Sequence, residues 1–365
     1  MHATAQIVCD KWVGPHGLCL PNEIKEMICN FAGLVIRDDG FEHRRCGLLH
    51  GKYKQWYDNG QLWKIINYID GNPHGECKSW WKNGQQLVIV NYVDGLLHGE
   101  YKEWRDNGQQ YEISNHVDGN LHGEYKRWHD NGQQLLIDSW IHGKRYGEFK
   151  MWYDDGQQQE ISSCVNGNYH GEHKRWFENG QLRTIDNWIH GLRYGEHKSW
   201  YDNGQQLEIS NWIDQKYHGE YKSWHKNGQQ EKICSYVDGK KHGKYKMWWD
   251  DGQQREISNY INGNFHGKYK KWFENGQQLI ICNYVYGKLH GEYRQWHSNG
   301  QQDEISSHVN GKLHGEYKQW YDNGQQLIIC NYVYGKLYGE YEQWYDNGCR
   351  RKIHNYGKWW LRWWW

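Results

Sequence analysis

Proline is almost absent from this sequence, and the aliphatic residues that fill a thick protein core are scarce. Only three of the 365 residues are proline, while 37% are apolar and 16% are aromatic. A thick aliphatic core is therefore not available, whereas a thin structure that buries mainly aromatic rings is. Proline removes a donor from β ladders, so its scarcity beside 43 glycines favours tight turns between hydrogen-bonded strands.

Net charge and long apolar runs are also missing. The 44 basic and 44 acidic residues give a formal net charge of zero, which provides no general field for nucleic acid or an anionic membrane. The longest apolar runs, such as Leu87–Val90, are far too short to span a bilayer. The first ten residues lack a basic region followed by an apolar one, so we expect no secretory signal and a cytoplasmic location, or a place in the virion if the protein is viral.

A period of 24 residues organises most of the chain. Glycine recurs thirteen times from Gly51 to Gly339 without an insertion, and a tryptophan follows each glycine five residues later, from Trp56 to Trp344. A second glycine and an isoleucine recur as regularly. A fixed period is the signature of a repeat architecture, so residues 47–356 are predicted to form thirteen tandem repeats. Positions are counted from the recurring glycine as position 0, which makes the tryptophan position 5.

Each repeat has the pattern of a β-hairpin. In the repeat from Gly315, two short aromatic and β-branched segments flank an Asp-Asn-Gly sequence. The glycine of that sequence supplies the positive φ that a type I turn followed by a bulge requires. A second, longer turn, such as Asp94 to His98, is expected to join one unit to the next.

The pairing across the Asp-Asn-Gly turn predicts which residues share a face. Tyr321 opposite Gln325 would place Tyr317 opposite Ile329, whereas a two-residue turn would shift this register by one and exchange the partners. Because side chains alternate along a strand, one face should carry Tyr317, Tyr321, Ile329, Asn331 and Val333. The other face should carry Trp320 and Tyr332.

The expected fold is all-β, an elongated single-layer antiparallel sheet of hairpin repeats, or solenoid. One hairpin alone is marginally stable, but thirteen would give about 26 strands and roughly 125 Å of sheet. Contacts should then lie almost entirely between neighbouring repeats. Such a sheet should twist, and its end strands need caps.

Ten cysteines are scattered without paired motifs. Cys234, Cys282 and Cys330 occupy one position in alternate repeats, which should separate them by roughly 19 Å, beyond disulfide reach. We expect them to be buried or half-buried thiols in a reducing compartment.

The unit Gly-x-Tyr-x-x-Trp-Tyr-x-x-Gly, followed by Asn-Tyr-x-x-Gly, resembles the MORN repeat over Gly47 to about Tyr356. It is most similar to the variant found in bacterial antitoxin-like proteins and in the repeat families of giant DNA viruses. The resemblance implies an elongated single-layer sheet that serves as a scaffold, a partner-binding surface or sometimes a lipid-associated module. The commonest MORN pattern has glycine where Lys54 or Gln55 stands, which weakens the transfer of lipid binding.

Residues 1–46 precede the repeats and contain a predicted amphipathic helix at about 20–32. Its apolar stripe and its first turn comprise Leu20, Pro21, Ile24, Ile28 and Phe31. The segment resembles the first helix of an F-box, which implies docking to an adaptor of SCF-type ubiquitin ligases. Only about 26 residues separate Pro21 from Gly47, too few for a three-helix F-box. We therefore favour a helical cap on the first strand, with adaptor docking as the alternative.

Two ladders of polar residues invite a chemical interpretation. Histidine precedes the repeat glycine in ten repeats, and tyrosine replaces it in three. Ladder neighbours should lie roughly 10 Å apart, too far to share a zinc ion, so a structural role is expected. Lysine or arginine recurs at position 3, with glutamate at position 1 in ten repeats. This pattern predicts a salt-bridged stripe, and its glutamates disfavour binding of single-stranded nucleic acid.

No catalytic motif stands out from the repeats. Nucleophile-elbow, phosphate-loop and Cys-x-x-Cys strings are missing from the sequence. An active site needs one exceptional constellation, whereas this array offers thirteen near copies. We therefore expect a protein that is not an enzyme and that has no cofactor and no metal.

Specificity in a repeat scaffold should reside at positions that vary while the frame stays fixed. Positions 4, 6 and 12 vary in size and charge, and they share a face in the expected register. The candidate partner-binding residues at these positions are Glu103, Arg105, Tyr111, Arg127, His129, Met151, Arg175, Phe177, Arg183, His225, Glu231, Met247, Trp249 and Lys271.

The Trp-rich tail, residues 357–365, leaves the repeat pattern abruptly. It could cover the final edge strand, which we favour, act as an interfacial membrane anchor, or result from a scrambled reading frame.

Two function classes follow for the whole chain. One is a protein-interaction adaptor whose N-terminal helix recruits a second partner, and the other is a structural or membrane-associated scaffold.

Overall fold

The computed structural model describes residues 34–35, 44–45 and 48–357, and every regular element in these ranges is a β-strand. The predicted helix at about 20–32 and tail residues 358–365 lie outside the described residues. The chain divides into two compact units, Met1–His170 and Gly171–Trp365, which are described separately.

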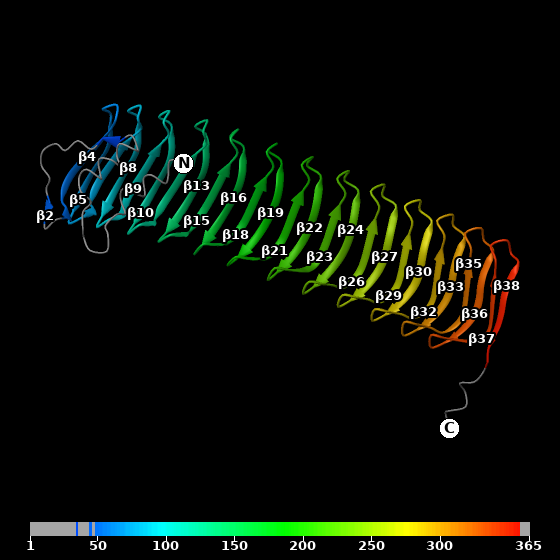
Figure 1. Ribbon diagram of the computed structural model, residues 1–365. Coiled ribbons are helices and arrows are strands. Elements are labelled where there is room, and N and C mark those ends of the chain that lie inside the picture. Colours follow the sequence, from blue (N-terminus) through cyan, green and yellow to red (C-terminus); the bar gives the residue numbers. More distant parts are fainter. Residues whose placement is uncertain (1–33, 36–43, 46–47, 358–365) are drawn as a thin grey trace, which may run out of the picture. The chain divides into compact units, whose positions relative to one another are not determined.

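In the first unit, each repeat contributes two long strands (Figure 1). The long strands are β4 (Gly51–Tyr57), β5 (Leu62–Ile69), β7 (Gly75–Trp80), β8 (Gln86–Val93), β9 (Leu96–Trp104), β10 (Gln110–Val117), β12 (Gly123–Trp128), β13 (Gln134–Ile141), β15 (Gly147–Trp152) and β16 (Gln158–Val165). The two-residue strands are β1 (Leu34–Val35), β2 (Arg44–Arg45), β3 (Leu48–Leu49), β6 (Asn72–Pro73), β11 (Asn120–Leu121), β14 (Lys144–Arg145) and β17 (Asn168–Tyr169). Strand β1 pairs with β4, and β2 pairs with β3.

The second unit repeats the same plan. Its long strands are β18 (Gly171–Trp176), β19 (Leu182–Ile189), β21 (Gly195–Trp200), β22 (Gln206–Ile213), β23 (Lys216–Trp224), β24 (Gln230–Val237), β26 (Gly243–Trp248), β27 (Gln254–Ile261), β29 (Gly267–Trp272), β30 (Gln278–Val285), β32 (Gly291–Trp296), β33 (Gln302–Val309), β35 (Gly315–Trp320), β36 (Gln326–Val333), β37 (Lys336–Trp344) and β38 (Arg350–Tyr356). Its short strands are β20 (Leu192–Arg193), β25 (Lys240–Lys241), β28 (Asn264–Phe265), β31 (Lys288–Leu289) and β34 (Lys312–Leu313).

Within each unit, consecutive long strands pair antiparallel and form one open sheet. Neighbours in the sheet are therefore neighbours in the sequence, as the repeat pattern predicted. The all-β antiparallel sheet of hairpin repeats is confirmed.

The Asp-Asn-Gly turn has the predicted geometry. The Tyr321 amide donates to the Gln325 carbonyl at 2.9 Å, and the Gly324 amide donates to the Tyr321 carbonyl at 2.9 Å. Gly324 has a φ of 81°, in the region that glycine adopts without a steric penalty. The Asn323 side chain accepts a bond from the Gln325 amide at 2.9 Å. This turn explains the recurring Asn-Gly pair.

The strand register beyond this turn differs from the expected one. Tyr317 lies opposite Cys330, and the prediction that it lies opposite Ile329 is wrong. Trp320 pairs with Gln326 whereas the preceding residue pairs with Ile328, so Leu327 is an extra residue in a β-bulge. The Gln326 side-chain amide donates to the carbonyls of Gln319 and Ile328, at 2.8 and 2.7 Å. Position 11 thus satisfies the backbone groups that the bulge removes from the ladder.

The bulge also changes which residues share a face. Tyr317 and Tyr332 lie on the same side, with ring centroids 5.8 Å apart, although they were expected on opposite sides. Because opposed residues share a face, Ile329 lies with Lys318, and alternation places Trp320 there too. Asn331 and Val333 lie on this second side as well, so the predicted grouping of these residues with Tyr317 is wrong. We call the side with positions 2, 4, 13, 15, 17 and 22 the tyrosine face, and the side with positions 1, 3, 5, 14, 16 and 18 the lysine face.

The connection between repeats is tighter than predicted. Val333 pairs with Lys336, which leaves a two-residue turn of Tyr334 and Gly335 with φ values of 48° and 83°. Two positive φ values are typical of the type I′ turn found in β-hairpins. The expected longer turn is therefore wrong. The additional residues lie in a second bulge around position 0, where Gly339 has a φ of 75°.

The core lies on the tyrosine face. In the second unit, Cys234 packs with Tyr221, Tyr245 and Tyr260, and Met247 covers the cluster's edge. A second cluster in the first unit packs around Ile66, Cys77 and Val90. Position 15 is buried in twelve repeats, and in eight of these it is serine or cysteine, small groups that fit between the tyrosine rings of adjacent strands. The predicted burial of Cys234, Cys282 and Cys330 is confirmed.

The tight turn between repeats generates a stability prediction at Gln215. It occupies position 20 with a φ of 64°, where the other repeats of the described chain have glycine. Its amide donates to the Arg193 carbonyl over 3.2 Å, longer than the bonds of the glycines at the same position. Gln215→Gly should remove left-handed strain and raise the free energy of unfolding by about 1 kcal/mol in chemical denaturation.

Lys216→Gly is the matched control, because Lys216 has no positive φ and gains nothing from glycine. A lower denaturation midpoint for Gln215→Gly than for the parent chain would contradict the strain at this turn.

Candidate functional site

Positions 4, 6 and 12 lie together on the tyrosine face beside the Asp-Asn-Gly turn, and we call this set the variable stripe. Positions 4 and 12 contact each other, as in the bond of 2.7 Å from the Ser223 hydroxyl to Glu231. Positions 6 and 12 contact each other where Arg255 lies over the Trp249 ring at 4.2 Å. The three positions lie close together although the register expected from the sequence was wrong. Position 12 is the extra residue of the bulge, and it lies on its strand next to positions 4 and 6 of the paired strand.

The first unit contains a cluster of stripe residues from two adjacent repeats. The Tyr111 ring lies between two guanidinium groups, 4.6 Å from Arg105 and 4.7 Å from Arg127. Arg127 also donates to the Tyr111 hydroxyl. Such cation–π contacts stabilise planar stacking of guanidinium on aromatic rings.

Backbone and carboxylate contacts hold Arg105 in place. Its Nη2 donates to the Trp128 carbonyl at 2.8 Å, and its Nη1 forms an ion pair with Asp130. The side chain is 22% exposed, so it keeps access to solvent while its orientation is fixed. The cluster is therefore ordered before any partner arrives.

Acidic residues lie beside these arginines. The Tyr101 hydroxyl donates to Glu103 at 2.8 Å, and the Tyr125 hydroxyl donates to Glu112 at 2.9 Å. Burial raises the pKa of Glu103, and the neighbouring Glu112 adds to this, while the bond from Tyr101 opposes it. Burial and the adjacent carboxylates also raise the pKa of Tyr101 and Tyr125.

A shallow depression of about 420 Å³ opens at this cluster. It is lined by Arg105, Tyr111, Arg127, Trp128, His129, Asp130, Asn131, Leu135 and Asp154. Four of these residues were candidate partner-binding residues from the sequence. The lining combines arginine, aromatic and carboxylate groups, which suits recognition of a polar protein surface more than a small apolar ligand.

The remaining candidates are spread along the stripe. Phe177 and Arg183 contact each other at 5.4 Å, and Glu231 binds Ser223. Met247 packs at the edge of the tyrosine core and accepts a contact from the Tyr245 hydroxyl at 3.3 Å. Glu103 and His129 adjoin the arginine cluster, whereas Met151, Arg175, His225, Trp249 and Lys271 belong to other repeats of the stripe.

Position 6 also has a structural role that sequence variation did not indicate. In most repeats its side chain binds the carbonyl of position 5 in the next repeat, although Phe177 and Phe273 have no polar atom to do so. The Tyr57 hydroxyl does so at 2.9 Å, the Trp81 indole at 3.0 Å and the His129 ring at 2.9 Å. Variation at position 6 is thus largely exchange among hydrogen-bonding groups that link repeats.

The structure brings together charged residues that the sequence reasoning missed. Asp186 is buried on the tyrosine face, 2.7 Å from the His197 ring nitrogen Nδ1 and 3.2 Å from Arg193 Nε. The same position in another repeat holds buried Asp138, 2.8 Å from Arg145 Nε. The signal was present in the sequence as aspartate at position 15 combined with arginine at position 22.

The two buried carboxyl groups differ in their electrostatics. Burial raises the pKa of Asp138, and the charge of Arg145 only partly opposes this. Burial also disfavours ionised Asp186, but the hydrogen bond and charge of His197, with the charge of Arg193, outweigh it and lower the pKa. Histidine at position 2 of the following repeat is the difference, because Phe149 takes the place of His197 beside Asp138.

The histidine ladder makes contacts between repeats. The Asp94 amide lies 3.4 Å from His74 Nδ1, and the Tyr286 amide lies 3.4 Å from His266 Nδ1. The ring centroids of His266 and Tyr286 are 4.9 Å apart. No group of three or more His, Cys, Asp or Glu residues suited to a metal occurs among the described residues. In the same part of the chain, no helix is both long enough and apolar enough to cross a membrane.

Comparison with known proteins identifies the repeat. The family described as MORN repeat variant matches eight stretches, residues 49–70, 73–94, 121–133, 169–190, 217–238, 241–262, 265–286 and 313–334. These eight stretches of the chain are therefore MORN repeats of the variant type. The matches include neither the F-box-like segment nor any evidence for a viral family. No curated protein matches the chain.

Solved structures offer only distant likenesses. The crystal structure of TcdB2-TccC3 is 12% identical over 83% of this chain and 18% of its own, with a TM-score of 0.18. The Photorhabdus luminescens Tc holotoxin pore is 12% identical over 88% of this chain and 18% of its own, with a TM-score of 0.17. The chain thus spans less than a fifth of the length of these structures.

The contrasting aspartates provide a matched test. Because folding lowers the pKa of Asp186, its ionised form stabilises the fold above the unfolded-state pKa, and this is lost as pH falls through the folded-state pKa. Asp186→Ser should lower the free energy of unfolding near neutral pH by about 3 kcal/mol, since it breaks a buried ion pair. The measurement is chemical denaturation from neutral to acidic pH.

Asp138→Ser should act in the opposite direction. Its pKa is raised on folding, so its contribution is present below the unfolded-state pKa and lost as pH rises through the folded-state pKa. Serine, common at this position, should therefore raise stability near neutral pH. Equal destabilisation by both substitutions would refute the distinction.

Proposed function

We propose that this protein is a non-catalytic scaffold that binds a protein partner through the variable stripe. One observation carries the proposal. Positions 4, 6 and 12 vary in size and charge, and they contact one another on one face of a sheet whose repeat glycine, tryptophan and isoleucine are constant. The constant positions build the sheet, so positions 4 and 12, and position 6 apart from its bond to the next repeat, can vary and encode specificity.

The cluster of Arg105, Tyr111 and Arg127 is proposed as the principal contact. Arginine and tyrosine are enriched among residues that dominate binding energy at protein interfaces. The stacking and the backbone bond of Arg105 fix these side chains beforehand, which reduces the entropy lost on binding. Asp130 and Asp154 at the rim would favour a partner surface with groups of both charges.

The finer roles suggested by the sequence extend this proposal. In the adaptor version, residues 20–32 recruit a second partner, such as a ubiquitin-ligase component, in the cytoplasm. In the alternative, the protein is a membrane-associated scaffold that uses the Trp-rich tail. Deletion of residues 1–46 should release a co-purified partner in the first case, whereas deletion of 357–365 should release membrane association in the second.

The stripe is tested by affinity capture with the full chain from its native cell. Tyr111→Ala combined with Arg127→Ala should reduce recovery of the captured partner about tenfold, because it removes a stacked anchor from the interface. The bound partner is quantified by mass spectrometry.

Glu316→Gln on the lysine face is the control, and it should leave recovery unchanged. Circular dichroism should show that both variants retain the parent fold. Undiminished recovery with the stripe variant, combined with loss in the control, would reject the assignment to the tyrosine face.

A further inference from the structure

The lysine face is neutralised in most repeats by pairs within one strand. Lysine or arginine at position 3 binds glutamate at position 1, with N–O distances from 2.5 to 2.9 Å in both units. Examples in the second unit are Lys222 with Glu220 and Arg294 with Glu292. These exposed pairs contribute little stability, but they leave almost no excess charge on the face.

Two consecutive repeats of the second unit break this pattern. Position 1 is Lys244 in one and Lys268 in the next, so each lysine at position 3, Lys246 and Lys270, lacks its usual glutamate. None of these four ammonium groups forms an ion pair within the described part of the chain. The repeat from Gly51 also has lysine at position 1, but the following repeat restores glutamate. The consecutive pair therefore creates a local positive charge in a chain of zero net charge.

Strand pairing fixes the arrangement of these lysines. Lys246 lies opposite Ile257, and Ile257 lies opposite Lys270 on its other side, so β27 separates β26 from β29. Lys244 lies opposite Asn259 in the neighbouring row. Two strand spacings give about 10 Å across the cluster, and two residues along a strand give about 7 Å. The four side chains thus frame a compact rectangle.

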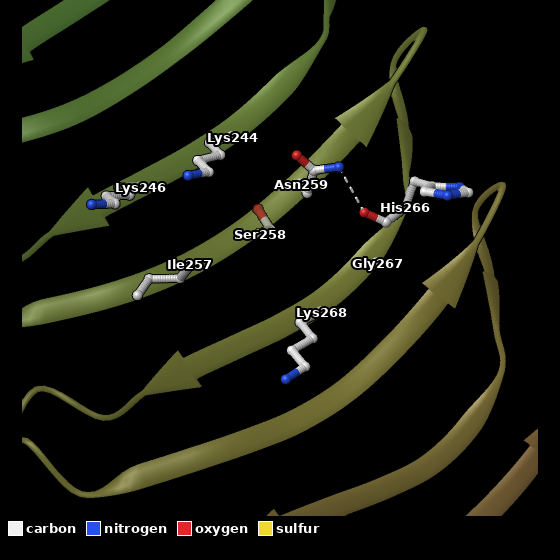
Figure 2. A pocket seen from close by; sticks show the side chains of 8 residues that line it. All are labelled: Lys244, Lys246, Ile257, Ser258, Asn259, His266, Gly267 and Lys268. Carbon is white, nitrogen blue, oxygen red and sulfur yellow. Dashed lines mark hydrogen bonds between the residues drawn. The ribbon is translucent and has the colours of Figure 1, made fainter.

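A depression of about 420 Å³ is lined by three of these lysines, all except Lys270. Figure 2 shows Lys244 and Lys246 on β26 and Lys268 on β29, with Ile257 and Asn259 on the strand between them. The Asn259 side-chain amide donates to the His266 carbonyl at 3.0 Å, and this bond fixes the Asn259 carboxamide in the lining of the depression. Lys244, Lys246 and Lys268 are exposed and can turn towards a bound group.

We propose that this lysine cluster binds a soluble anion carrying two or more phosphate groups. Lysine is a compact charge with three donors, which suits phosphate oxygens, and four lysines exceed what one phosphate can neutralise. The boundaries of the cluster limit the size of the anion. In the flanking repeats Glu220 and Glu292 neutralise Lys222 and Arg294, so the positive charge ends there and offers no continuous track to a long polyanion or an anionic membrane.

The test uses isothermal titration calorimetry of the full chain with inorganic tripolyphosphate, pyrophosphate and orthophosphate. Affinity should fall in that order and should weaken as salt is added, because the contacts are between exposed charges. Lys244→Glu combined with Lys268→Glu restores the pattern of the neighbouring repeats and should preserve the fold. It should weaken tripolyphosphate binding at least about tenfold.

Lys216→Glu combined with Lys312→Glu is the charge-matched control, since both lysines are exposed and lie in other repeats. The control should retain affinity within about twofold. Equal weakening in both double variants would overturn the proposal, because it would show a general charge effect. Failure of tripolyphosphate to bind, or binding only to phosphatidylcholine vesicles containing phosphatidic acid, would overturn it as well. The cluster lies on the face opposite the variable stripe, so this outcome is independent of partner capture.

Discussion

The β-bulge after each Asp-Asn-Gly turn is the constraint on which both faces of the sheet depend. One extra residue on the second strand places position 15 opposite position 2, and therefore puts Cys330 beneath Tyr317. The bulge removes two carbonyls from the ladder, and the Gln326 side chain satisfies both. Without the bulge, the register would shift by one residue, and the isoleucines of the lysine face would replace the small residues that are buried opposite tyrosine. The bulge thus determines which side chains form the core, and it has the same register where position 11 is leucine, as at Leu62 and Leu182.

Side-chain contacts at both ends of the strands keep successive repeats in the same register. In most repeats position 6 binds the carbonyl of position 5 in the next repeat, and asparagine at position 8 binds the carbonyl of position 7, as Asn83 does to Asp106 at 2.6 Å. At the other edge, histidines such as His74 contact the next turn. Each repeat therefore aligns its successor, which is how a thin sheet with a small core on one face keeps a uniform arrangement.

The sequence was sufficient to predict the repeats, the hairpins and the antiparallel sheet, because period and turn chemistry are local properties. Register was not predictable from the turn alone, since the bulge follows one residue after the predicted Tyr321–Gln325 pair. A signal was nevertheless present. Glutamine recurs at position 11 in ten repeats, and a long polar side chain inside a strand indicates a backbone group that needs a partner. The Asp186 cluster was also missed, because its members come from two repeats and adjoin only after the register is known.

Sites in such an array arise where adjacent repeats depart from the pattern together. The second strand of each repeat pairs with the first strand of its own repeat and with the first strand of the next, so a side chain at position 14 or 15 lies between residues of two repeats. One substitution changes the neighbour on only one of the two flanking strands, whereas two substitutions at paired positions change the neighbours on both strands. In this way Asp186 contacts His197 and Tyr111 contacts Arg127 of the next repeat. Lys246 and Lys270 lie on either side of Ile257. Candidate sites in a regular array can therefore be located from the sequence, because two deviations in consecutive repeats indicate where strand pairing brings the changed side chains together.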